Sequence, residues 1–158
     1  MTEKPKKIIG RADLIDFPEI GVFAVHAKVD TGAKTSAVWA SDIHERDDGL
    51  AFKLFDKQSS YYTGQELFCD QFERVVVASS IGQEQPRYKV AILAKIRGKK
   101  IRTNFTLADR SQQAYPVLIG RNALRGKFVV DVQAGKPDYK AERHRSDLLQ
   151  RELGEELK

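Results

Sequence analysis

The segment from Tyr88 to Leu107 constrains the fold most, because apolar and polar side chains alternate along two runs joined by a turn. The first run ends at Ile96, the tetrapeptide Arg97-Gly98-Lys99-Lys100 follows, and the second run extends from Ile101 to Leu107. A period of two residues is typical of a half-buried strand, and a short glycine-containing link between two such runs indicates a hairpin. We therefore predict a long antiparallel hairpin.

Several shorter runs also have the composition of strands. The run Val22–Val29 is rich in β-branched and other apolar residues, and turn residues bound further runs at 8–9, 12–15, 50–55, 72–78, 116–119 and 128–132. Arg121 to Leu124 is predicted to begin a helix. Many short strands separated by turn signals favour a mostly β fold, either a barrel or a sandwich.

The composition changes at Pro137. The last segment is highly charged, and its leucines recur at helical spacing at positions 148, 149, 153 and 157. This apolar stripe is narrow. We therefore predict one domain over residues 1–136, followed by a helical or flexible tail over residues 137–158.

Charge and cysteine content restrict the partners and the compartment. The formal net charge is +5, which favours anionic partners such as acidic peptides or nucleic acid. The single cysteine, Cys69, cannot form an internal disulfide, as is usual in a reducing compartment. No apolar run approaches the roughly 20 residues that cross a bilayer, and no signal peptide is evident. A cytoplasmic protein without a membrane span is expected.

The tripeptide Asp30-Thr31-Gly32 is the strongest candidate for chemistry. The apolar run that ends at Val29 delivers the aspartate to the start of a turn. Thr31 can lock such a loop through side-chain hydrogen bonds, and Gly32 lets backbone approach the carboxylate closely. An Asp-Thr-Gly string is common by chance, so its meaning depends on what accompanies it.

Two later elements accompany it in a specific order. Leu107-Ala108-Asp109-Arg110 comes first, and Val117 to Leu124, which contains Gly120-Arg121-Asn122, follows. Together with Asp30 to Ser36, these motifs resemble the retropepsin-like aspartic peptidases. The resemblance is closer to the RimB-like subgroup, which is often labelled "ATP-dependent zinc protease" and associated with ATP-grasp glutamate ligases that modify a small-subunit ribosomal protein. It covers roughly residues 8 to 132.

The resemblance implies a retropepsin-like closed β-barrel of short strands, with one short helix after Gly120-Arg121-Asn122. It also implies a twofold homodimer in which Asp30 and its symmetry mate form the catalytic dyad. By carry-over, Thr31, Gly32 and Ala33 form the active-site loop, where Thr31 braces the two loops and Gly32 contacts the substrate backbone. Gly120, Arg121 and Asn122 support this loop from behind.

The residues leave two segments open for the flap and do not give Arg121 the acidic partner that viral relatives have. We expect the flap at Ser79 to Pro86, with Ser80, Ile81 and Gly82 at its tip, because this segment precedes the long hairpin; Tyr61 to Glu66 is the alternative. Viral relatives commonly have an acidic residue where this chain has Lys34. We therefore expect another acid, Asp109, to serve as the partner of Arg121.

No cofactor is expected. His26, His44 and His144 are scattered, and the chain has neither a His-Glu-x-x-His string nor a phosphate-binding Gly-x-x-x-x-Gly-Lys-Ser/Thr loop. The sequence thus predicts no metal site and no nucleotide hydrolysis by this chain alone.

Two classes of function remain open from the residues. The first is a cytoplasmic aspartic endopeptidase that acts on acidic or glutamylated protein tails, with a functional link to a glutamate ligase and a ribosomal protein. The alternative is a non-catalytic retropepsin-fold module that binds peptides by strand addition or associates with the ribosome.

Overall fold

The alternating segment forms the longest hairpin of the molecule. In the computed structural model, which describes residues 4–78 and 81–157, strands β8 (Glu84–Ile96) and β9 (Lys99–Ala108) pair antiparallel. Arg97 and Gly98 connect them with φ angles of 50° and 79°. Positive φ at both central residues is the geometry of the two-residue turns that match strand twist. The predicted hairpin is confirmed.

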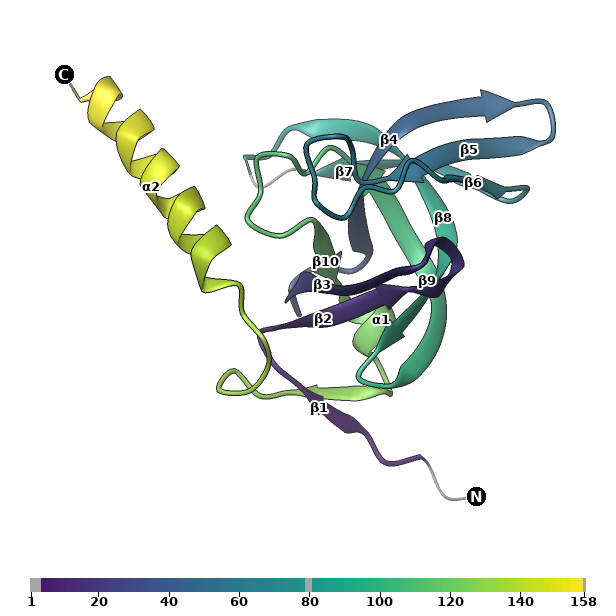
Figure 1. Ribbon diagram of the computed structural model, residues 1–158, viewed down its shortest axis with the longest axis horizontal. Coiled ribbons are helices and arrows are strands. Elements are labelled where there is room, and N and C mark those ends of the chain that lie inside the picture. The colour runs from purple at the N-terminus through teal and green to yellow at the C-terminus, as the bar shows by residue number, and fades with distance from the viewer. Residues whose placement is uncertain (1–3, 79–80, 158) are drawn as a thin grey trace.

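The main sheet closes on itself around the core. Its strand order is β10-β3-β2-β8-β9-β4-β5-β6, and β10 also pairs with β4, so the strands from β10 to β4 complete a ring (Figure 1). The ring encloses buried side chains such as Phe17, Val25, Ile96 and Phe105. The mostly β, retropepsin-like fold is confirmed. The remaining strands are β1 (Lys7–Ile9), β2 (Ala12–Phe17), β3 (Val22–Val29), β4 (Ser36–Arg46), β5 (Gly49–Leu54), β6 (Glu66–Cys69), β7 (Glu73–Ala78), β10 (Val117–Ile119) and β11 (Phe128–Val130).

Strand β10 lies between β3 and β4, which are consecutive in sequence. It runs parallel to β3, with Leu118 opposite Lys28, and antiparallel to β4, with Leu118 opposite Ala37. The chain from β3 to β4 must therefore pass around the end of β10. Helix α1 (Arg121–Leu124) follows β10 directly, as predicted, so it begins beside this passage.

Two strands were not expected. Strand β4 is buried from Ser36 to Ala40 but mostly exposed beyond, and its pairing with β5 shifts between Ser41 and His44, where Asp42 has a positive φ of 48°. The shift breaks the regular alternation that marks a strand in sequence. Strand β6 is only four residues long.

Strands β1 and β11 form a separate two-stranded parallel ribbon below the barrel (Figure 1). Ile8 and Val129 are register partners on this ribbon and are 55% and 54% exposed, respectively. The ribbon therefore presents an apolar pair to its surroundings.

The C-terminal segment forms helix α2 (Tyr139–Glu156), which projects away from the barrel (Figure 1). No residue of α2 is buried, and the helix begins where Asp138 accepts a hydrogen bond from the Ala141 backbone nitrogen at 3.0 Å. A short 3₁₀ helix, η1 (Pro18–Ile20), connects β2 to β3. Neither α1, α2 nor η1 is long and apolar enough to cross a membrane, and these are the helices of the described ranges.

Candidate active site

Asp30 lies at the end of β3, where the chain turns around β10. Its backbone nitrogen donates to the Ile119 carbonyl at 2.9 Å, and its own carbonyl accepts from the Ala33 nitrogen at 3.2 Å. The Gly32 nitrogen donates to the Asp30 Oδ1 at 2.9 Å. A Cβ at Gly32 would come within 3.2 Å of that same oxygen. The half-buried carboxylate is therefore oriented by its own loop, and Gly32 leaves room for this contact.

The loop after Asp30 is held by the start of α1. The backbone nitrogens of Arg121 and Asn122 donate to the carbonyls of Ala33 and Lys34, at 2.8 and 3.2 Å. Gly120 makes this approach possible, because a Cβ at this position would lie 2.8 Å from the Thr35 carbonyl carbon. Only glycine fits between the two backbone segments.

A polar network behind the loop joins Ser36 to Asn122. The Asn122 Oδ1 accepts from the Ser36 backbone nitrogen at 2.9 Å and from the Ser36 hydroxyl at 2.8 Å. The same hydroxyl accepts from the Gly120 nitrogen at 3.0 Å, and the Asn122 amide donates to the Asn104 carbonyl at 2.8 Å. Each polar group in this buried corner has a partner, which fixes the loop relative to the barrel.

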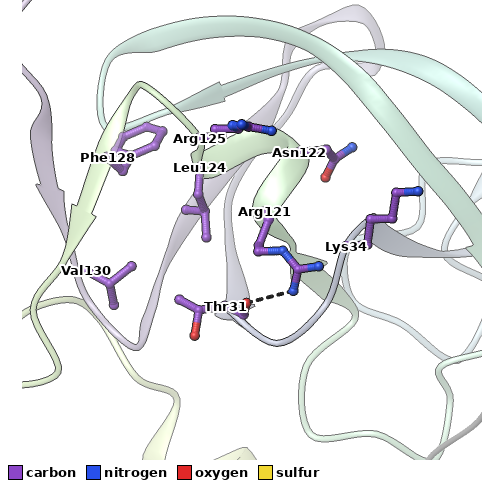
Figure 2. A pocket seen from close by; sticks show the side chains of 8 residues that line it. All are labelled: Thr31, Lys34, Arg121, Asn122, Leu124, Arg125, Phe128 and Val130. Carbon is purple, nitrogen blue, oxygen red and sulfur yellow. Dashed lines mark hydrogen bonds between the residues drawn. The ribbon is translucent and has the colours of Figure 1, made fainter.

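Arg121 supports the loop through a carbonyl. Its guanidinium donates to the Thr31 carbonyl at 3.1 Å, as the dashed line in Figure 2 shows. The expected pairing of Arg121 with Asp109 is wrong. Asp109 instead accepts from the Ser111 backbone nitrogen at 2.9 Å, and the bonds from Ser111 lower the pKa of Asp109. With Lys34 in the loop, Arg121 has no ion pair among residues 4–78 and 81–157.

One side of the loop borders a largely apolar cavity of about 610 Å³. Figure 2 shows an apolar wall of Leu124, Phe128 and Val130 beside Thr31, and the cavity is also lined by polar and charged side chains: Lys34, Arg121, Asn122 and Arg125. Thr31 is exposed. A cavity with apolar walls and an exposed threonine loop suits contact with another apolar surface.

The other side of the loop has a cation. Arg110 is half-buried in the connection between β9 and β10, and its Nε donates to the Tyr115 carbonyl at 3.0 Å. Burial lowers the pKa of Arg110 to about 10, the neighbouring charge of Arg87 lowers it too, and Asp30 opposes both effects. Asp30 therefore lies within electrostatic reach of a desolvated guanidinium.

The two flap candidates differ in how they attach to the barrel. Ser79 and Ser80 lie outside the described residues, whereas Ile81 and Gly82 lie in the turn between β7 and β8, where Ile81 is 78% exposed. Strand β7 pairs only with β8 among the described strands. The alternative segment, Tyr61 to Glu66, is tied down, since Tyr61 packs on the Phe55 ring at 5.5 Å and Gln65 donates to the Glu19 carbonyl.

No group of three or more His, Cys, Asp or Glu side chains that could hold a metal ion occurs in the described part of the chain. His26 instead bonds through Nδ1 to the Lys136 carbonyl at 2.9 Å, and His44 bonds to the Asp42 carbonyl at 3.1 Å. Both histidines thus contact backbone.

Two residues of the site were missed in the sequence. Ser36 belongs to the string that begins at Asp30, and Arg110 ends the string that begins at Leu107. Both positions could have been recognised as site candidates, because the serine ends the string that begins with Asp-Thr-Gly and the arginine belongs to the Leu-Ala-Asp-Arg motif. What they contact could not be recognised, because their partners lie on other strands.

Known proteins resemble this chain in sequence. A protein of Shewanella pealeana named "Probable alpha-L-glutamate ligase" is 32% identical over 130 residues, which are 80% of this chain and 28% of that protein. One of the same name from Desulfotalea psychrophila is 28% identical over the same shares. The chain therefore spans only 28% of the length of these relatives.

A solved structure and a family model complete the comparison. The crystal structure of Lpg0085 from Legionella pneumophila, a protein of unknown function, matches with a TM-score of 0.63 at 22% identity, covering 83% of this chain and 97% of that one, which supports the fold. The model of the RimB-like family, "Retropepsin-like aspartic endopeptidase RimB", matches residues 8–136. This chain therefore belongs to the RimB-like family of retropepsin-like aspartic endopeptidases.

Proposed function

We propose that the chain is a homodimeric aspartic endopeptidase, in which Asp30 and Asp30 of a second copy activate water together. The observation that carries the proposal is the Asp30 carboxylate, which is oriented by the Gly32 nitrogen and remains partly exposed. The chain contributes a single Asp-Thr-Gly loop. A complete dyad therefore requires two chains related by a twofold axis.

The surface beside Thr31 supports this pairing. The cavity lined in part by Leu124, Phe128 and Val130 adjoins the loop through Thr31. A second copy that covers these apolar groups brings its own Thr31 and Asp30 to the same axis. Burial of apolar surface at about 25 cal/mol per Å² drives such an association.

The chemistry follows from two carboxylates held close together. Two aspartates about 3 Å apart do not both ionise, so the pair holds one proton. The ionised carboxylate takes a proton from water, whose oxygen attacks the scissile carbonyl carbon, and the protonated carboxylic acid donates to the carbonyl oxygen. When the tetrahedral intermediate collapses, the C–N bond breaks, a hydroxyl of the intermediate returns a proton to the dyad, and the leaving nitrogen takes a proton from the dyad. The pair titrates as a unit.

An acidic or glutamylated protein tail is the substrate that we favour. The relatives that carry this segment are named probable alpha-L-glutamate ligases, and the segment makes up 28% of their length. A peptidase domain on the same chain as a ligase would meet the polymer that the ligase makes. The net charge of +5 and the Arg110 side chain suit such an anionic tail, for instance one on a ribosomal protein. The single cysteine agrees with action in the cytoplasm.

The test compares wild type with Asp30→Asn on peptides with polyglutamate tails, at pH values from about 3 to 8, which span the dyad titrations. Wild type is expected to cleave, and Asp30→Asn is expected to lose at least about a thousandfold in kcat/KM, because the dyad loses its ionisable carboxylate. Asp147→Asn, a matched change on the exposed surface of α2, is the control. Cleavage by Asp30→Asn at the wild-type rate rejects the proposal, and peptide binding without cleavage by wild type supports the peptide-binding module instead.

A further inference from the structure

Arg110 is a half-buried cation with one hydrogen bond to the protein. Its Nε donates to the Tyr115 carbonyl, and its remaining N–H groups form no hydrogen bond with a residue of the described ranges. A guanidinium carries five N–H donors in a rigid fork, so most of its capacity is unused. The same side chain lines a cavity of about 240 Å³ together with His26, Trp39 and Asp138. Arg110 is thus available to an acceptor that the chain does not supply.

Arg87, near the start of β8, lies within electrostatic reach of Arg110. The register pairs of β8 and β9 run to Lys89 opposite Thr106. Two residues beyond this pair, Arg87 lies on β8 and Ala108 on β9, and Arg110 follows Ala108 by two residues. The Arg87 guanidinium donates to the Gln85 side chain at 3.2 Å. Burial lowers the pKa of Arg87, as it does for Arg110, and the Arg87 charge lowers the pKa of Arg110. The two positive charges therefore destabilise each other.

The described chain supplies neither arginine with an ion pair. Arg11, Arg46 and Arg102, by contrast, each pair with a glutamate. Asp30 favours the charged form of Arg110 without forming an ion pair with it. Asp138, which lines the same cavity, accepts from the Ala141 nitrogen at the start of α2. Two desolvated like charges are costly unless an anion lies between them.

We propose that Arg87 and Arg110 form a carboxylate-binding subsite that selects an acidic side chain of the peptide next to the scissile bond. The proposal rests on the proposed function, since Asp30 defines where the peptide lies. One arginine comes from the hairpin and the other from the loop before β10, so a carboxylate between them is held from two sides. Arginine forks bind carboxylates through paired, charge-assisted hydrogen bonds, which gives both attraction and orientation.

The experiment measures binding in the Asp30→Asn background, where no cleavage interferes. Capped hexaglutamate and hexaglutamine are titrated by calorimetry at fixed salt. Adding Arg110→Gln is expected to raise the Kd for hexaglutamate at least about tenfold, because one charge-assisted hydrogen bond is lost. The Kd for hexaglutamine is expected to stay unchanged. Arg110→Lys retains the charge without the fork and is expected to fall between. Arg143→Gln, the same charge change on the exposed side of α2, is expected to have no effect.

The outcomes separate this subsite from the peptidase activity. An undiminished preference for hexaglutamate in folded Arg110→Gln overturns the subsite. If that variant does not fold, Arg87→Gln, on the hairpin arm, decides by the same criterion. Glutamate-selective binding that depends on Arg110, together with no cleavage by wild type, supports the subsite and rejects the peptidase. Equal cleavage of acidic and neutral peptides by wild type supports the peptidase and overturns the subsite.

Discussion

The two sides of the Asp30 loop differ in what they can accept. The Thr31 side borders a cavity of about 610 Å³ in which Leu124, Phe128 and Val130 form an apolar wall, with Lys34, Arg121 and Arg125 around it. On the Arg110 side, a smaller cavity of about 240 Å³ is lined by Arg110, His26 and Asp138 and by no residue of the Asp30 loop itself. An apolar surface is stabilised by covering it with another apolar surface, whereas desolvated charge needs a counter-charge. We infer that one side meets a second copy and the other meets substrate.

The largest effect is expected from a charge on the apolar side. Val130→Asp places a carboxylate in the apolar wall that the second copy is proposed to cover, and the desolvation of a buried charge costs several kcal/mol. We expect the dimer mass to fall to that of a monomer, and kcat/KM to drop more than about a hundredfold because the dyad is lost. Light scattering coupled to size exclusion measures the mass.

Leu157→Asp is the matched control for this change. Leu157 is 88% exposed, and it follows the last residue of α2. Leu157→Asp should leave both the dimer mass and kcat/KM unaltered. A monomeric Val130→Asp that retained full activity would falsify the shared dyad, and with it the contrast between the two sides.

The second-largest effect is expected from the hydrogen-bond network of Ser36 and Asn122, which holds the Asp30 loop. Asn122→Ala removes the acceptor of the Ser36 nitrogen and hydroxyl, which leaves buried donors unpaired. Such a loss costs about 2–3 kcal/mol, or roughly 5–10 °C in Tm for a chain of this size. Denaturant and thermal unfolding measure it.

Asn104→Ala is the comparison for Asn122→Ala, because the Asn104 contact to this network uses its backbone carbonyl and survives the change. Its side chain is exposed, so a shift within about 0.5 kcal/mol is expected. Equal destabilisation by both variants would mean that the network does not hold the loop.

The smallest effect is expected at the junction between α2 and the Arg110 side of the loop. Glu142 accepts from Arg11 at 2.7 Å and from the Tyr115 hydroxyl at 2.5 Å, and Tyr115 also accepts from Arg110 through its carbonyl. Burial, followed by the Glu142 bond, raises the pKa of Tyr115 to about 12. Glu142→Gln weakens a partly exposed ion pair, so we expect a loss below about 1 kcal/mol. Hydrogen exchange of the α2 amides measures it, with Glu152→Gln as the control.

The pH dependence of this junction has a definite sign. The hydrogen bond from Arg11 lowers the pKa of Glu142 in the folded protein. Its contribution is therefore present above the ordinary carboxyl pKa of about 4.3 and is lost as the pH falls through the lower folded value. Acid should lower the protection factors of the α2 amides in wild type and change them less in Glu142→Gln. The same acid response in both would assign it to another group.

Several local features of the fold were predicted correctly from the sequence. The period of two through Ile96 predicted the long hairpin, and the run Val22–Val29 predicted β3 with the same bounds. Strand β4 was not predicted, because its outer half is polar and its register shifts at Ser41. Short-range periodicity is a property of neighbouring residues, so it fails where an irregular strand interrupts it.

The sequence by itself determined the Asp30-Thr31-Gly32 turn, the alternating strands and the helix that follows Gly120. Only the tertiary structure decided what surrounds that turn. Ser36 and Asn122 are 86 positions apart and meet because β10 enters between β3 and β4. Arg110 comes within reach of Asp30 through that same strand order, while Asp109 turns to Ser111. The physical reason is that long-range contacts depend on strand order and register, which side-chain periodicity does not specify.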